Sequence, residues 1–136
     1  MSVRVTVESA VKPTEDETKV ERALHNVFPS ARIERAVVED SLKLVIHGDG
    51  FEFLSTLRNL IKQERIRNAA RRILSGSTRG QRIHVYLNKQ AAFVNRISFC
   101  EAEGESPLGP ISIMIEAANP EGVVDYLTLR RDQRRR

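Results

Sequence analysis

Arginine and lysine are concentrated in one stretch of the sequence, residues 58–96. The stretch holds ten basic residues and a single acid, Glu64, so its net charge is +9. In the whole chain, 17 of the 22 basic residues are arginine. A guanidinium group offers a planar fork of donors that grips a phosphate through two hydrogen bonds and also stacks on bases. The stretch therefore predicts a surface that binds a polyanion, with a merely solvated basic face as the alternative.

The spacing of apolar residues places several of these arginines on a helix. A helical stretch is predicted over 51–76, with one apolar stripe in residues 54–61 and a second in residues 66–74. The second stripe is rotated by more than a third of a turn, which predicts a break near Gln63 and Glu64 or two consecutive helices. The candidate phosphate contacts are Arg65, Arg67, Arg71 and Arg72, which lie opposite the second stripe, and Arg79 and Arg82 farther along the chain.

Three polar residues, Asn88, Lys89 and Gln90, follow a predicted strand. Asn and Gln amides can read base edges and a lysine ammonium can contact phosphate, so we expect RNA contacts here. The alternative is a turn whose polar groups satisfy the backbone at the end of the strand. On the strand itself, an arginine, a histidine and a tyrosine alternate with apolar residues over 82–86 and are suited to stacking on unpaired bases if their face is open.

Side chains that perform catalysis or bind metal ions are sparse. The three histidines are not in ligand spacing with one another or with Cys100. The acids of residues 101–105 are of the type that gathers Mg²⁺ for phosphodiester cleavage, but carboxylates two apart in a loop are usually solvated. We therefore expect no catalytic site, no metal and no other cofactor, and we expect that the protein is not an enzyme.

Length and composition limit the class of protein. The chain has 136 residues, of which 40% are hydrophobic and 29% charged, as in one domain with a compact core. No run of about eighteen apolar residues occurs, so we expect no membrane span. Residues 1–10 lack the layout of a signal peptide, and a single cysteine cannot form an internal disulfide. A cytoplasmic location is the expectation.

The net charge of +4 is the sum of segregated blocks. Residues 1–57 are net acidic, and residues 97–129 contain six acids and no lysine or arginine. The last seven residues contain five arginines and one acid. We predict a single α+β domain over residues 1–129 and a flexible, arginine-rich tail over residues 130–136.

Alternation of apolar and polar residues predicts strands, and the helical stretches fall between them. The predicted element order is β-α-β-β-α-α-β-β-β-α. Because most strands alternate cleanly, we expect a two-layer α+β sandwich, in which a single, mostly antiparallel sheet carries helices on one face. Thr14 and Glu17 match a capping box for the first helix, and Asn119 with Pro120 begins the last one.

Three segments together carry a family resemblance: QERIRNAAR (63–71), YLNKQAAFV (86–94) and ESPLGPI (105–111). In this order and spacing, the chain resembles a small, uncharacterised family of archaeal proteins described as RNA-binding or exosome-associated. The similarity extends from the first strand to the last helix. The resemblance implies the fold of the large-subunit ribosomal protein that binds the smallest ribosomal RNA, which is a two-layer α+β domain.

The sequence thus favours a non-enzymatic RNA-binding protein whose arginine-rich helix face contacts phosphates, with a role in RNA processing or near the ribosome. The alternative is a protein-interaction subunit that forms a homodimer or joins an RNA-processing complex without touching RNA.

Overall fold

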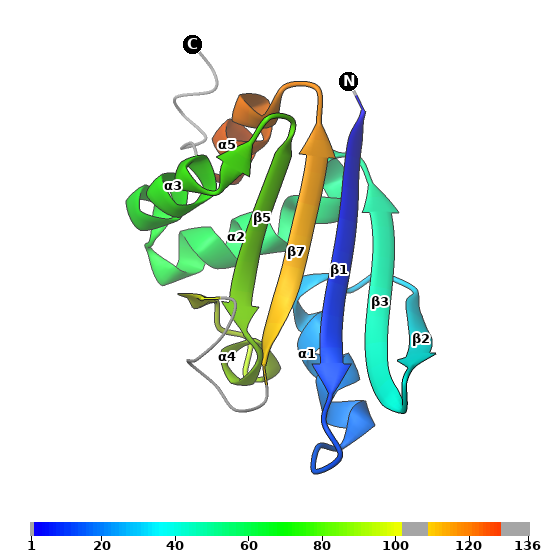
Figure 1. The fold of residues 1–136 in the computed structure, drawn as a ribbon. Coiled ribbons are helices and arrows are strands. Elements are labelled where there is room, and N and C mark those ends of the chain that lie inside the picture. The colour runs from blue at the N-terminus through cyan, green and yellow to red at the C-terminus, as the bar shows by residue number, and fades with distance from the viewer. Residues whose placement is uncertain (1, 102–108, 129–136) are drawn as a thin grey trace.

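A computed structural model describes residues 2–101 and 109–128 of the chain. Seven strands form one sheet in the order β2-β3-β1-β7-β5-β4, and β6 pairs with β5 (Figure 1). The strands are β1 (Val3–Val11), β2 (Ile33–Val38), β3 (Ser41–Asp49), β4 (Thr78–Arg79), β5 (Arg82–Asn88), β6 (Phe99–Cys100) and β7 (Pro110–Ala117). All the strand pairs among the described residues are antiparallel.

The helices lie behind the sheet in the view of Figure 1 and leave its front face open. They are α1 (Glu17–Val27), α2 (Ser55–Glu64), α3 (Arg67–Gly76), α4 (Lys89–Phe93) and α5 (Pro120–Thr128), with a 3₁₀ turn at Phe51–Leu54. The predicted α+β sandwich is therefore confirmed. None of the described helices is long and apolar enough to cross a membrane. The predicted tail over 130–136 lies outside the described residues.

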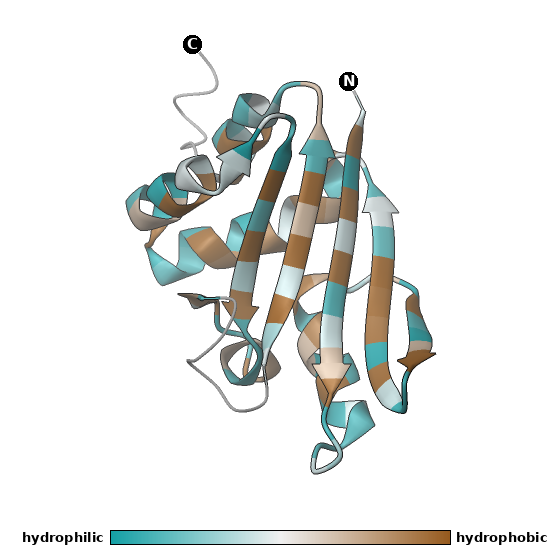
Figure 2. Cartoon of the chain, viewed as in Figure 1, coloured by the Kyte–Doolittle hydropathy of each residue, from teal (hydrophilic) through white to brown (hydrophobic). Residues whose placement is uncertain are grey.

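Strict alternation in the central strands produces the two faces. In β1, Val3, Val5 and Val7 are at most 1% exposed and point toward the helices. In the neighbouring strand β7, the inward positions are Ile111, Ile113 and Ile115, which are fully buried. Brown and teal bands alternate along these strands in Figure 2. Burial of this one apolar face against the helices is the main source of stability.

The predicted break in the long helical stretch is confirmed. Helix α2 ends at Glu64, and Arg65 adopts a left-handed conformation with φ 60° and ψ 39°. Its backbone N–H donates to the carbonyl of Lys62, which closes the helix end. Helix α3 then starts at Arg67 in a new direction, so that Ala70 and Leu74 still face the core.

Two local predictions are wrong. Asp16, not Thr14, caps α1: its carboxylate accepts a 2.9 Å hydrogen bond from the backbone N–H of Thr18. The predicted element order has no helix between the strands that become β5 and β6, but the structure has the short helix α4 there, which begins at Lys89. Aspartate is as good a cap as threonine, and its position one residue before the helix decides between them.

Gly48 lies on the helix-covered face of β3, where a side chain has no room. A methyl group at this position would overlap the Phe53 ring, which is itself stacked on Phe28 with ring centroids 5.2 Å apart. We expect Gly48→Ala to lower the free energy of unfolding by about 1–3 kcal/mol, measured by denaturant unfolding. Gly76→Ala is the control, because its methyl group meets nothing within 4 Å. Wild-type stability of Gly48→Ala would contradict this packing.

Candidate nucleic-acid interface

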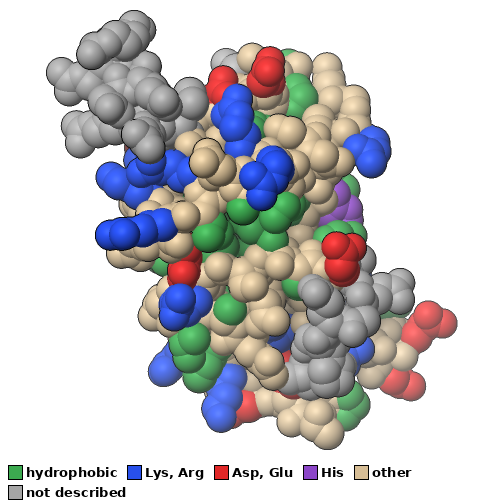
Figure 3. All heavy atoms as spheres, turned by 90° about the vertical axis from the view of Figure 1, so that its left-hand side faces the viewer, with side chains coloured by type: hydrophobic (Ala, Val, Ile, Leu, Met, Phe, Trp, Pro, Cys, Tyr) green, Lys and Arg blue, Asp and Glu red, His purple; other side chains and the backbone are tan. Residues whose placement is uncertain are grey.

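Three of the predicted phosphate contacts lie at the end of α2 and along α3. Arg65 and Arg72 are exposed, and Arg67 is half-buried at the first residue of α3. None of their guanidinium groups has a hydrogen bond or ion pair to a described residue. Figure 3 shows several lysine and arginine side chains on this side of the molecule. Unpaired guanidinium groups keep their donors available for a phosphate.

Glu64, the acidic residue nearest to these arginines in the sequence, is already paired with another arginine. Glu64 accepts hydrogen bonds from Arg96 at 2.5 Å (Nε) and 3.0 Å (Nη2), and its side chain is only 14% exposed. The hydrogen bond from Arg96 holds the pKa of the Glu64 carboxyl below its usual value. Because Arg96 neutralises Glu64, the junction between α2 and α3 keeps its positive charge.

Arg71, the fourth helix arginine, is used to join α3 to α5. Its Nη2 lies 2.7 Å from Oδ1 of Asp125, and its Nη1 donates to Oγ1 of Thr128 at 3.0 Å. The side chain is still 41% exposed. Arg71 therefore fixes the helix that presents its neighbours, and its charge is partly cancelled.

Arg79 and Arg82 are also engaged. Arg79 donates from Nη1 to the carbonyl oxygens of Gly76 and Thr78, both at 2.9 Å. Arg82 donates from Nε to Glu116 at 2.9 Å across the β5–β7 pair. Arg82 points to the open side of the sheet, so the structure does not place it with the arginines of α3.

The predicted group at 88–90 is mostly structural. Asn88 caps α4, because its Oδ1 accepts a 2.8 Å hydrogen bond from the N–H of Ala91. Lys89 is 4% exposed, and its Nζ donates to the carbonyl of Ala10 at 2.7 Å and to Glu15 at 3.0 Å. The expectation that Lys89 contacts phosphate does not fit this buried position. Gln90 alone is exposed.

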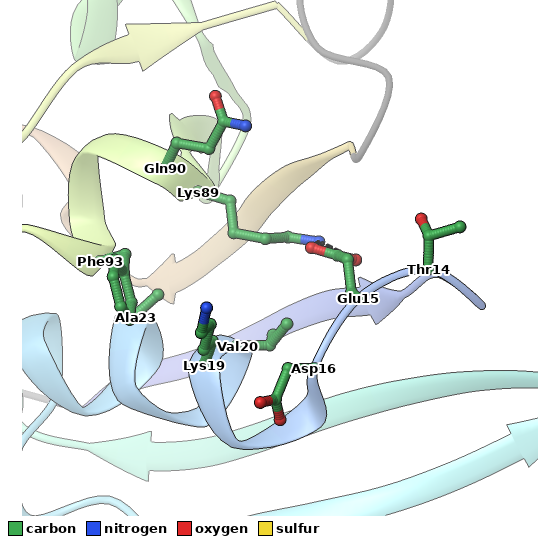
Figure 4. A pocket seen from close by; sticks show the side chains of 9 residues that line it. All are labelled: Thr14, Glu15, Asp16, Lys19, Val20, Ala23, Lys89, Gln90 and Phe93. Carbon is green, nitrogen blue, oxygen red and sulfur yellow. Dashed lines mark hydrogen bonds and ion pairs between the residues drawn. The ribbon is translucent and has the colours of Figure 1, made fainter.

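Glu15 and Lys89 form part of the wall of a pocket of about 390 Å³ between α1 and α4 (Figure 4). Burial lowers the pKa of Lys89, and the hydrogen bond from Lys89 to Glu15 opposes that shift. The side chains are 5% and 8% exposed for Lys89 and Glu15. The apolar part of the lining comes from Val20, Ala23 and Phe93. The pair connects α4 to the turn before α1, which explains why this lysine is not on the surface.

The strand face predicted from β5 exists and is open. Arg82, His84 and Tyr86 alternate with the buried Ile83 and Val85. The rings of His84 and Tyr86 lie 4.7 Å apart, and Nε2 of His84 is 2.7 Å from Oγ of Ser112. The predicted common orientation of these three side chains is therefore confirmed. Their charge is small, because Glu116 neutralises Arg82.

Two other basic residues of the stretch 58–96 were missed as functional residues by sequence reasoning. Arg58 of α2 lies over the Tyr126 ring of α5, 4.7 Å from its centroid, and Arg96 pairs with Glu64. Tyr126 and Glu64 are far in sequence from the arginines that they contact, so no local sequence pattern predicts these two contacts. Within residues 2–101 and 109–128, no three His, Cys, Asp or Glu side chains gather as metal ligands would.

Comparison with known proteins places this chain in a family. A sequence model of a family described as RNA binding matches residues 4–117, so the chain belongs to that RNA-binding family. The chain is 41% identical to the UPF0201 protein of Sulfolobus acidocaldarius over 92% of its own length and 86% of the relative's. It is 40% identical to the UPF0201 protein of Pyrobaculum neutrophilum, over 96% and 90% of the two chains.

Solved structures agree with the fold. The UPF0201 protein of Methanococcus jannaschii superposes with a TM-score of 0.81 at 27% identity, covering 93% of each chain. A DUF54 protein from Methanothermobacter thermautotrophicus shares the fold with a TM-score of 0.60 at 21% identity, over 92% of this chain and 95% of that one. The expected archaeal family is thus confirmed. The exosome association and the likeness to a ribosomal protein stay predictions.

Removing one partner of the buried pair tests its structural role. Glu15→Ala removes the carboxylate partner of the buried Lys89 ammonium, so we expect a loss of about 3 kcal/mol in the free energy of unfolding. Arg35→Ala removes the partner of Glu17 from an exposed pair with a 2.7 Å contact, and should cost much less. Equal losses in urea unfolding would refute the assignment.

Proposed function

We propose that the protein is a non-enzymatic, cytoplasmic RNA-binding protein that holds phosphates at the junction of α2 and α3 and along α3. The observation that carries this proposal is the set of three arginines, Arg65, Arg67 and Arg72, that have no partner among the described residues. The family description points to the same class of ligand.

The surrounding contacts support the same surface. Arg71 ties α3 to α5, so the arginines of α3 are carried on a helix fixed at its side. Arg96 pairs with Glu64, the one acid in the basic stretch, so Glu64 does not compete with phosphate for the other arginines. A rigid, positively charged turn contacts a phosphate backbone without reading sequence, because phosphates carry no base identity. Binding should therefore be strongly salt-dependent and weakly sequence-dependent.

RNA binding across a salt series tests the proposal. The wild-type chain is compared with a variant carrying Arg65→Gln, Arg67→Gln and Arg72→Gln, with one single-stranded and one structured RNA. If about four phosphates are neutralised, log affinity should fall with log salt at a slope of about −3, and the variant's slope should be about 2 shallower. Fluorescence anisotropy gives the affinities, and gel analysis of the recovered RNA tests the expectation that it is not cleaved.

The control variant removes the same charge from the other end of the sheet. It carries Lys12→Gln, Arg32→Gln and Arg35→Gln, beside β1 and β2, and should bind RNA almost as the wild type does. Both comparisons are repeated without residues 130–136, because five arginines in that segment could bind RNA by themselves. Equal, weak binding by all variants would reject the proposal and favour a protein-interaction subunit.

A further inference from the structure

We infer that the open face of the sheet is a docking surface for a second copy of this chain. This face is made of the outward residues of four neighbouring strands. They are Arg4, Thr6, Glu8 and Ala10 of β1; Ser112, Met114 and Glu116 of β7; Arg82, His84 and Tyr86 of β5; and Lys43, Val45, His47 and Asp49 of β3. No helix of the described chain covers them (Figure 1).

The charges of the open face do not suit a polyanion. Arg82 is paired with Glu116 at 2.9 Å, and Lys43 is paired with Glu8 at 3.2 Å. Asp49 adds a further carboxylate beside Arg4. A face with interspersed charges of both signs repels phosphates about as much as it attracts them, but it suits a partner with the same mixed pattern.

The strand register makes this pattern complementary to itself. One row across the sheet reads Asp49, Arg4, Glu116, Arg82 from β3 to β5, so its charges alternate. Consider two copies whose open faces pack together around a two-fold axis that runs between the sheets, parallel to the strands and midway between β1 and β7. In this arrangement, β7 of one copy lies over β1 of the other. Arg4 then faces Glu116 of the second copy, and Asp49 faces its Arg82. A two-fold axis forms each of these contacts twice.

The remaining rows fit the same arrangement. The next row places Thr6 opposite Met114 of the second copy and His47 opposite its His84. The row after that places Val45 opposite the Tyr86 ring of the second copy. Like charges never oppose each other among these positions. Two sheets that pack face to face at the usual separation of about 10 Å would bring such side chains into contact.

The test is a reciprocal charge swap, read by sedimentation velocity on the full chain over a wide range of concentrations. Wild type should form a dimer. Arg4→Glu alone and Glu116→Arg alone should each weaken it at least about a hundredfold, because like charges then meet at both symmetric contacts. A mixture of the two variants should dimerise again, since each contact across the mixed dimer regains one positive and one negative partner.

Matched variants keep the outcome decisive. Arg32→Glu and Glu121→Arg make the same charge changes at exposed positions away from the open face, and their dimers should match the wild type. If either β1 or β7 variant fails to fold by circular dichroism, Asp49→Arg and Arg82→Asp form a second reciprocal pair on the outer strands.

Several results would overturn the inference. These are a monomer at every concentration, a dimer indifferent to Arg4→Glu, or a mixture of the two variants that stays monomeric. RNA that dissociates the wild-type dimer, and whose binding is lost when Tyr86 and His84 are changed to Ala, would assign the open face to RNA instead.

Discussion

The helices cover only one face of the sheet, and the rest of the molecule depends on that one-sided burial. Because side chains alternate along β1 and β7, each strand contributes Val and Ile to the core and polar residues to the other side. A slip of one residue in the pairing would exchange the two sets, so burial fixes the register. The same register that builds the core also arranges the alternating charges of the open face.

The distribution of carboxylates decides which arginines are available. Asp125 forms an ion pair with Arg71, Glu116 with Arg82, and Glu64 with Arg96. All three pairs join elements that are distant in the sequence. Arg65, Arg67 and Arg72 have no partner among the described residues, so the basic stretch is divided into arginines that hold the fold and arginines that can hold a ligand.

Periodicity predicted the fold well, because alternation and apolar stripes are local consequences of burial. The break near Glu64 followed from the rotation of one stripe against the next. The position of Lys89 could not be predicted in this way, because its partner Glu15 lies in a turn far away in the sequence and only the folded chain brings them together. Arg71 and Arg82 are likewise predicted as phosphate contacts from residue type alone, and only the tertiary structure shows that they pair with Asp125 and Glu116. Arg65 and Arg72 are exposed and Arg67 is half-buried, and their contact with phosphate stays a prediction.

The central strand pair also has a consequence for the way the chain folds. Strand β1 pairs with β3 on one side and with β7 on the other, and the pairing of Val3 with Ala117 spans most of the described residues. Until β7 is in place, one edge of β1 presents unpaired backbone N–H and C=O groups. Such a high contact order predicts slow, cooperative folding, in which the pairing of β1 with β7 completes the core.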